Sequence, residues 1–191
     1  MKITEYKVLL ASNSPRRREL LQRLGIDFEI KVLPDIDETY SSSMPVNEVA
    51  EFIAQKKAKS YTDKLKEDEL LITADTVVIL DNTILGKPAD AKEATEMLNK
   101  LSGKTHKVIT GVCLVSTKKE VSFSVASEVQ FAELSHEEIA HYIINYSPFD
   151  KAGSYGIQEW IGYIGVKHLS GSYYNIMGLP IQRLYCELKK F

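Results

Sequence analysis

Three consecutive arginines, Arg16, Arg17 and Arg18, stand at the start of a predicted helix, directly after an apolar run and a serine-rich turn. The free N–H groups of a helix start carry partial positive charge, which normally favours acidic side chains there. Arginines in this position instead favour an anion, and a strand–turn–helix junction is a common binding place for phosphate. Successive helical residues point about 100° apart, so one or two of the three would face a ligand. The alternative interpretation is a solvated basic helix face.

Carboxylates form the second group of candidates. Asp75 follows the apolar run Leu70–Ala74, where an unpaired carboxylate is costly and requires a metal, a lysine or a solvated cleft. Asp35, Asp37 and Glu38 stand close together in a predicted loop. Joined with Asp75, they could share a hard cation such as Mg²⁺, which takes one or two carboxylates plus phosphate oxygens. The alternatives are a turn cap for Asp75 and a solvated acidic loop for the others.

The positions of three lysines, and the absence of several well-known motifs, limit the classes of reaction that the site could catalyse. Lys56 and Lys57 lie on a predicted helix and Lys87 precedes a proline. With the arginines and carboxylates they indicate a metal–phosphate site at strand ends. The sequence contains neither the Gly-rich patterns of P-loop and dinucleotide-binding proteins nor the esterase pattern G-x-S-x-G. Histidines without paired spacing are interpreted as surface or structural residues: His106, His136, His141 and His168.

Bulk properties exclude several classes of partner. The 191 residues carry a net charge of −2, which gives no general attraction for nucleic acid or an anionic membrane and favours a small anionic ligand. No run approaches the roughly 20 apolar residues of a membrane span, and no secretion signal is recognisable at the start. Cys113 and Cys186 lack metal-ligand spacing, so we expect free thiols in a reducing cytoplasm.

The elements that must position these residues alternate between strands and helices, which predicts an α/β or mixed α+β protein, expected to be a single domain over residues 1–191. The apolar run before Asp75 is expected to end at Asp75–Thr76. Ser14 and the pair Ser135 and Glu138 are expected helix caps. Strands are expected over Lys7–Ala11, Phe28–Val32, Leu70–Ala74, Val77–Leu80, Lys107–Leu114 and Val121–Phe131, and helices over Pro15–Leu24, Val46–Lys64, Asp90–Leu101, Glu133–Tyr146 and Pro180–Lys189.

Taken in order along nearly the whole chain, the motifs resemble those of the Maf family of nucleoside triphosphate pyrophosphatases. The matching segments are LLASNSPRRRELL (Leu9–Leu21), IDET (Ile36–Thr39), AQKKA (Ala54–Ala58), ITADTVV (Ile72–Val78), GKP (Gly86–Pro88), LSGKTHKVITGV (Leu101–Val112), DKAGSYGIQ (Asp150–Gln158) and GSYYNIMGLP (Gly171–Pro180).

The resemblance implies a two-lobed mixed sheet with flanking helices, similar to the inosine triphosphate pyrophosphatase-like fold, with a cleft between the lobes. It also implies cleavage of a nucleoside triphosphate to the monophosphate and pyrophosphate with a divalent cation, Mg²⁺ or Mn²⁺, and suggests a homodimer. Asp75 would be the general base, and Glu38 would hold the metal or water beside it. The expected phosphate-binding or neutralising residues are Ser12, Arg16, Arg17, Lys57 and Lys87, with Arg18 on the surface.

Three positions distinguish branches of the family. The residues here are Arg16, Thr76 and the segment Tyr155–Gln158, which resemble the dTTP/UTP branch rather than the branch that acts on 7-methyl-GTP. Gln158 offers both a donor and an acceptor to a uracil or thymine edge. Trp160 nearby would stack or pack. The alternatives that the sequence leaves open are the 7-methyl-GTP activity, modified pyrimidine nucleotides as substrates, and a nucleotide-binding regulator of cell division.

Overall fold

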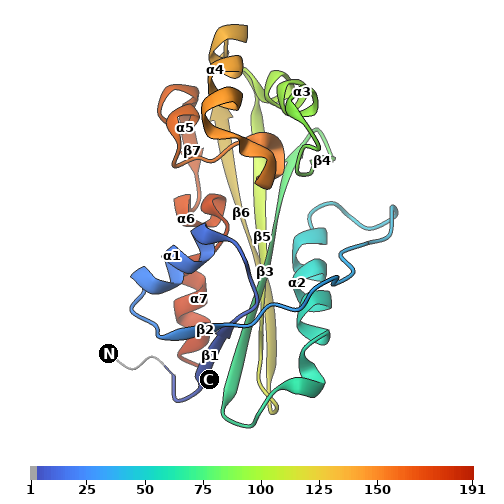
Figure 1. Cartoon of the computed structure of the whole chain (residues 1–191), viewed down its shortest axis with the longest axis vertical. Helices are drawn as coiled ribbons and strands as arrows, with labels where there is room; N and C mark the ends of the chain where they lie inside the picture. The colour runs from blue at the N-terminus through green and yellow to red at the C-terminus, as the bar shows by residue number, and fades with distance from the viewer. Residues whose placement is uncertain (1–3) are drawn as a thin grey trace. The chain divides into compact units, whose positions relative to one another are not determined.

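The computed structural model describes residues 4–191. Within them the chain forms a mixed α/β structure with one seven-stranded sheet in the order β2-β1-β3-β5-β6-β7, in which β4 pairs with β3 (Figure 1). The strands are β1 (Lys7–Leu10), β2 (Phe28–Ile30), β3 (Glu69–Leu80), β4 (Thr83–Leu85), β5 (Thr105–Val115), β6 (Glu120–Phe131) and β7 (Val166–Ser170). The α-helices are α1 (Pro15–Arg23), α2 (Val49–Lys59), α3 (Ala91–Leu101), α4 (His136–Tyr146), α5 (Trp160–Gly165), α6 (Tyr173–Met177) and α7 (Ile181–Leu188), and the 3₁₀ helices are η1 (Thr62–Lys64), η2 (Pro148–Asp150) and η3 (Ala152–Ser154).

The chain divides into two compact units. Unit 1 comprises Met1–Asp75, Thr110–Val125 and Gly178–Phe191, and unit 2 comprises Thr76–Ile109 and Ala126–Met177. Strands β3, β5 and β6 therefore each contribute residues to both units.

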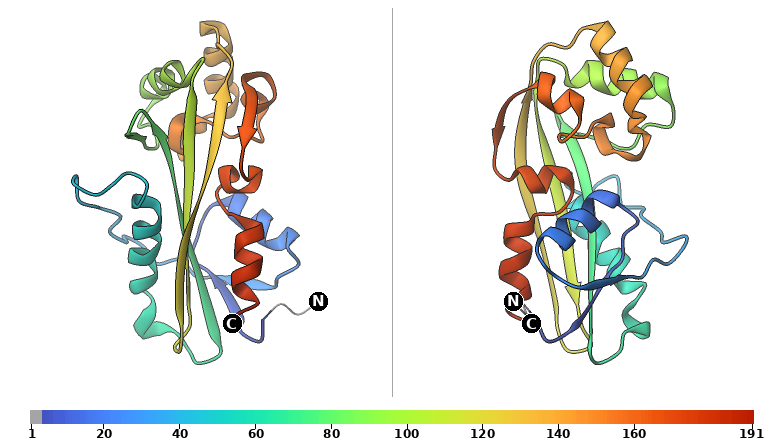
Figure 2. Two further views of the ribbon diagram at one scale, coloured as in Figure 1. Left: turned by 180° about the vertical axis from the view of Figure 1, so that it is seen from behind. Right: turned by 60° about the vertical axis from the view of Figure 1, so that its left-hand side comes forward.

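Unit 1 is built around β1, which pairs in parallel with β2 on one side and β3 on the other. Helix α2 lies on one face of these strands, and α1 and α7 lie on the other (Figures 1 and 2). Strands covered on both faces are apolar along their length, and this explains why β1 and the first part of β3 are buried almost throughout. The core beneath α2 contains Leu9, Ala54, Ala58, Tyr61, Leu71, Cys113 and Val115.

Helix α2 lies unusually close to the sheet. A Cβ atom on Gly111 of β5 would stand 2.3 Å from the carbonyl carbon of Ala50, so only glycine permits this approach. The buried Thr73 hydroxyl on β3 donates to the Ala54 carbonyl oxygen at 2.7 Å. These two contacts set the height and position of α2 on the sheet.

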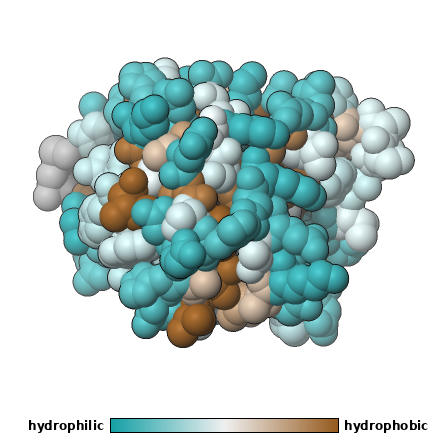
Figure 3. All heavy atoms as spheres, turned by 90° about the horizontal axis from the view of Figure 1, so that it is seen from above, coloured by the Kyte–Doolittle hydropathy of each residue, from teal (hydrophilic) through white to brown (hydrophobic). Residues whose placement is uncertain are grey.

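Unit 2 has its own core, in which α3 and α4 pack on the sheet with residues of the segment after α4. The core includes Val78, Leu98, Val108, Phe131, Tyr142, Tyr155 and Ile161. Hydrophilic residues dominate the face seen from the α3 and α4 side, with hydrophobic residues in separate areas (Figure 3). This outer surface is typical of helices with one apolar face turned inward.

Local signals in the sequence placed several boundaries. The hydroxyl of Ser14 accepts from the Arg17 N–H at 3.4 Å, and Pro15 is the first residue of α1. Ser135 and Glu138 form the expected capping box of α4. Both predictions are confirmed. The caps could be predicted from the sequence because each one joins residues only three positions apart.

Three expectations differ from the structure. The apolar run does not end at Asp75–Thr76, because β3 continues without a break to Leu80. The Asp75 carboxylate can stay within the strand since a lysine of α2 pairs with it. No strand or helix was predicted between Tyr146 and Pro180, but this region contains α5, α6 and the strand β7, which pairs antiparallel with β6. The helix expected over Val46–Lys64 is shorter and forms α2 and η1.

Candidate active site

The arginine-first helix begins as expected and has no acidic residue in its first turn. Ser12, which is buried, accepts a hydrogen bond from the Ser14 N–H at 3.2 Å. Arg16 is partly buried. Arg18 was expected on the surface, but it is only partly exposed and folds back to donate to the Ser12 carbonyl oxygen and the Asn13 side chain.

Arg17 links the start of α1 by hydrogen bonds to the segment before α7 and to strand β3, both in unit 1. Its Nε donates to the Gly178 carbonyl oxygen at 2.9 Å, and its Nη1 donates to the Ala74 carbonyl oxygen at 2.9 Å. Nη1 also lies 3.4 Å from Ser12 Oγ. Burial lowers the pKa of the guanidinium, while the charge of Asp75 acts in the opposite direction. Arg17 therefore holds the backbone immediately before Asp75.

Lys57 brings two of the predicted carboxylates together. Its Nζ lies 2.8 Å from Asp75 Oδ1 and 3.1 Å from Glu38 Oε1. The side chains of Lys57 and Asp75 are 13% and 15% exposed, whereas that of Glu38 is 52% exposed. We call these three residues the lysine–carboxylate cluster. Helix α2, strand β3 and the loop before α2 each supply one member.

The other acidic residues of the loop do not join the cluster. Asp37 pairs with Lys56 at 2.6 Å, and the hydrogen bond from Lys56 holds the pKa of that carboxyl well below its usual range. Asp35 is exposed, with a positive φ of 53°. Among residues 4–191 no group of three or more His, Cys, Asp or Glu side chains could hold a metal. For Asp35 and Asp37 the structure favours the alternative interpretation, an exposed acidic loop, over a cation shared with Asp75.

The two carboxylates of the lysine–carboxylate cluster do fit a divalent cation that keeps other ligands. The closest contacts to Lys57 are made by Glu38 Oε1 and Asp75 Oδ1. Mg²⁺ is usually bound by one or two carboxylates together with water and substrate phosphates. The donor set of Glu38 and Asp75 matches that pattern.

The remaining predicted site residues belong to unit 2. Thr76 follows Asp75 in β3 and is partly exposed, and Lys87 is exposed in the segment between β4 and α3. Gln158 lies in the turn before α5. Its Oε1 is buried and has no hydrogen-bond partner among the described residues. Trp160 is partly buried and packs on His141, with ring centroids 4.7 Å apart.

Sequence reasoning did not single out the polar network next to Gln158. Tyr142 of α4 bonds to Glu159, and Glu159 also pairs with Lys151. Tyr142 and Glu159 are 17 residues apart, and no spacing rule connects a residue on a helix with one in a distant turn. Only the DKAGSYGIQ segment, read as a family motif, pointed to this region.

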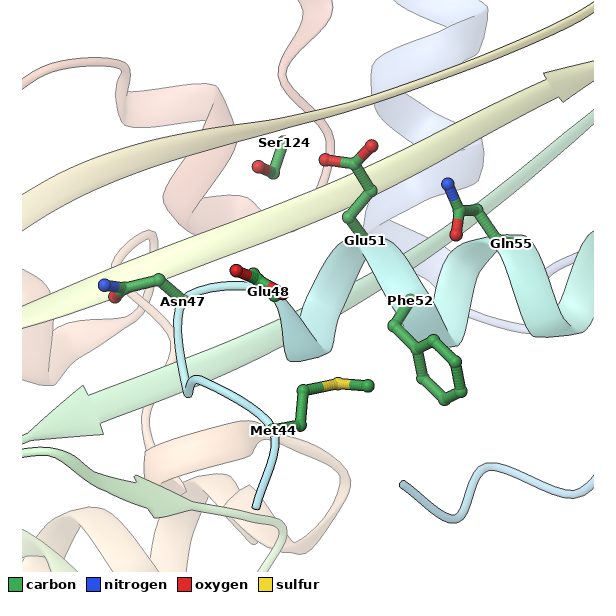
Figure 4. Close-up of a pocket in the computed structure, with 7 residues that line it drawn as sticks. All are labelled: Met44, Asn47, Glu48, Glu51, Phe52, Gln55 and Ser124. Carbon is green, nitrogen blue, oxygen red and sulfur yellow. The ribbon is translucent and has the colours of Figure 1, made fainter. Parts of the chain in front are cut away.

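A pocket of about 330 Å³ lies elsewhere in unit 1. Its lining residues are Met44, Asn47, Glu48, Glu51, Phe52, Gln55 and Ser124. Figure 4 shows Glu51 and Gln55 projecting from α2 on the side of the strand that carries Ser124. Both side chains bond to Ser122, at 2.7 Å each. None of the predicted site residues lines this pocket. Its residues Glu51 and Gln55 anchor α2 to Ser122 of β6.

The structure agrees with the predictions that the histidines are surface or structural residues and that the cysteines are free thiols. His106 is buried against Tyr155, and the other three histidines are exposed. Cys113 and Cys186 are free, and burial raises the pKa of the Cys113 thiol to about 12. In the part of the chain that the structure describes, no helix is both long and apolar enough to span a membrane.

Curated relatives match almost the full chain. A protein of Phocaeicola vulgatus named dTTP/UTP pyrophosphatase is 59% identical over 188 residues, which cover 98% of this chain and 97% of the relative. Proteins of the same name from Bacteroides thetaiotaomicron and Flavobacterium psychrophilum are 56% and 46% identical, each over 98% of this chain and 97% and 95% of the relative.

Solved structures support the fold. The Ham1 protein of Staphylococcus aureus aligns with a TM-score of 0.57 at 15% identity, over 96% of this chain and 98% of that one. A HAM1 protein from Coxiella burnetii aligns with a TM-score of 0.53 at 17% identity, over 97% of this chain and 100% of that one. The expected similarity to this fold is confirmed. A family model described as Maf-like protein matches residues 7–191, and the chain therefore belongs to the Maf-like family.

Proposed function

We propose that this protein is a nucleoside triphosphate pyrophosphatase that hydrolyses dTTP and UTP, and modified pyrimidine nucleotides of the same shape, to the monophosphate and pyrophosphate. The lysine–carboxylate cluster carries the proposal, because it places a largely buried carboxylate, Asp75, beside one ammonium and a second carboxylate. The names of the curated relatives favour the same substrates.

Asp75 is the proposed general base. It takes a proton from a water molecule, whose oxygen attacks as the bond between the α- and β-phosphates breaks and pyrophosphate leaves. Lys57 keeps Asp75 and Glu38 side by side, since its single charge offsets the repulsion between them. General-base catalysis of this kind contributes about 10²- to 10⁴-fold to the rate.

Cationic and hydroxyl groups are proposed to bind the phosphates. Ser12 and Arg16 lie at the start of α1, where backbone N–H groups favour an anion, and Lys87 adds a second ammonium. Arg17 contributes positive charge near Asp75 while its Nε and Nη1 stay bonded to carbonyl oxygens. Developing charge on phosphate oxygens is what such groups stabilise.

Glu38 and Asp75 are the residues that would hold a divalent cation, Mg²⁺ or Mn²⁺. When bound, the cation supplies charge neutralisation on the phosphate oxygens. The lysine–carboxylate cluster has two negative charges and one positive charge, which favours a cation over a further anion.

Arg16, Thr76 and Gln158 are proposed to select a pyrimidine. The buried, unpartnered Oε1 of Gln158 supports this role, because a buried acceptor without a donor costs about 1–3 kcal/mol and a base N–H would relieve that cost. Uracil and thymine carry such an N–H. The free cysteines are in keeping with an enzyme of the reducing cytoplasm.

The test is pyrophosphate release from a panel of dTTP, UTP, modified pyrimidine nucleotides, purine triphosphates and 7-methyl-GTP, with and without Mg²⁺ or Mn²⁺. We expect dTTP and UTP to be preferred, activity to require the cation, and Asp75→Asn to lower kcat by about 10²- to 10⁴-fold. Asp63→Asn, an exposed aspartate of η1, is the matched control.

Three outcomes would contradict the proposal. Full activity of Asp75→Asn would remove its role as base, and preference for 7-methyl-GTP would assign the other branch. Tight nucleotide binding without turnover at saturating metal would instead indicate a nucleotide-binding regulator.

A further inference from the structure

The turn that carries Gln158 is held by a polar network buried within unit 2. Tyr142 is fully buried on α4. Its hydroxyl accepts from the Gly156 N–H at 3.0 Å and donates to Glu159 Oε2. Burial, and then the hydrogen bond to Glu159, raise the pKa of Tyr142, so the hydroxyl stays a donor. One hydroxyl thus joins both sides of the turn.

Glu159 is fixed from a second direction. Its other oxygen, Oε1, lies 3.1 Å from Lys151 Nζ, and Lys151 also bonds to Asp150 at 2.7 Å. The side chains of Lys151 and Glu159 are 9% and 20% exposed. A carboxylate whose two oxygens bond to different groups has one orientation, and in a largely buried site those bonds are strong.

The backbone of the turn is shaped to receive this carboxylate. A Cβ atom on Gly156 would stand 2.8 Å from Glu159 Cδ and 2.9 Å from Oε2. The carboxylate therefore lies directly against Gly156, and a side chain at Gly156 would displace the carboxylate from this position. On the far side of the turn, a Cβ atom on Gly162 would stand 1.8 Å from the Ile157 carbonyl oxygen. The backbone on both sides of Gln158 is thus enclosed.

We infer that Tyr142 and Glu159 are positioning residues that hold the Gly156–Gln158 turn so that Gln158 presents its side chain to the base of the substrate. This inference rests on the proposed function. The unpartnered, buried Oε1 of Gln158 connects the network to a ligand, because a buried acceptor kept without a partner needs a rigid support. The ligand group is an N–H donor on the base edge, as in uracil and thymine.

The experiment compares dTTP with its N3-methylated analogue, which lacks the N–H donor. Tyr142→Phe keeps the ring, which stacks on Tyr146, and removes only the hydroxyl. Glu159→Gln is the second variant, and Gln158→Ala defines the loss of base recognition. We expect Tyr142→Phe and Glu159→Gln to raise KM for dTTP by about three- to tenfold with little change in kcat, and to leave the kinetics of the methylated analogue unchanged.

Non-additivity gives a readout that a purely structural role would not produce. Tyr142→Phe combined with Gln158→Ala should behave like Gln158→Ala alone, because the network acts through Gln158. Tyr146→Phe, on the same helix and outside the network, should leave both substrates unaffected. Thermal unfolding of each variant checks that it folds, and Glu159→Gln serves as the test if Tyr142→Phe does not.

Two results would overturn the inference in distinguishable ways. If the wild type releases pyrophosphate from dTTP and both variants keep its KM ratio between the two nucleotides, Tyr142 and Glu159 do not position Gln158. An equal loss of activity on both nucleotides leads to the same conclusion. If the wild type releases no pyrophosphate from any triphosphate, the proposed function fails, and the inference fails with it.

Discussion

Lys57 shows how one residue defines the chemistry of the candidate site. Its ammonium is a compact point charge that contacts Asp75 and Glu38 from a flexible stem, a geometry that the planar guanidinium of arginine does not reproduce. The lysine–carboxylate cluster keeps a net negative charge beside an arginine-rich helix start. Opposite charges arranged in this way suit a substrate that combines anionic phosphates with a divalent cation.

At the same scale, His106 predicts a pH dependence of stability. Burial lowers its pKa to about 4, from an ordinary 6.5. Between pH 6.5 and about 4 the unfolded chain binds a proton that the folded chain does not, so the free energy of unfolding falls as the pH is lowered through this window. The difference amounts to roughly 3 kcal/mol.

Denaturant unfolding at a series of pH values from 4.5 to 7.5 measures this effect. In His106→Gln the free energy of unfolding should no longer show this dependence on pH. In His168→Gln, at an exposed histidine, the dependence should remain. An unchanged slope in His106→Gln would assign the pH dependence to other groups.

At the scale of elements, α2 is the part of unit 1 on which the site depends. It carries Lys57, and its position is set by contact with Gly111 and by the bond from Thr73. The contact with Gly111 is backbone against backbone, so an added methyl group cannot be accommodated by a rotamer change.

We therefore expect Gly111→Ala to lower the free energy of unfolding by about 1–3 kcal/mol and to displace Lys57 from Asp75. Pyrophosphate release should also fall when it is measured well below the melting temperature, where the variant is folded. The loss of activity then comes from the displacement of Lys57 and not from unfolding. Gly86→Ala is the control for stability, since no described atom outside Gly86 and its two chain neighbours lies within 4 Å of its Cβ position. A fully stable Gly111→Ala would show that α2 can move without cost.

At the scale of the whole molecule, the two units share three strands. β3, β5 and β6 each run from one unit into the other. A strand that loses its partners in one unit loses support in the other, so we expect the chain to unfold in one cooperative transition and to behave as the single domain proposed from the sequence.

The single tryptophan, Trp160, provides the measurement, because it belongs to unit 2 and reports on that unit alone. Leu71→Ala in unit 1 and Leu98→Ala in unit 2 both truncate fully buried side chains, and each should cost about 2–5 kcal/mol. Both variants should shift the Trp160 fluorescence transition and the far-ultraviolet circular dichroism transition together. A Leu71→Ala variant that shifts only the circular dichroism would show independent units.

Local patterns determined much of the structure. The caps at Ser14 and Ser135 and the turn at Asp81–Asn82, where both residues have positive φ, depend on residues close in sequence. β7 was not predicted from the sequence, because its stability comes from pairing with β6, about 40 residues away, and not from its own five residues.

The residue types of the site were also evident from the sequence: arginines at a helix start, a carboxylate in an apolar run, and lysines on a helix. Their partners were not. Only the tertiary structure decided that Asp75 stays within a continuous strand and pairs with Lys57, and that Asp37 pairs with Lys56 instead. The physical reason is that a sequence specifies which groups need a counter-charge, while the packing of α2 on the sheet determines which group supplies it.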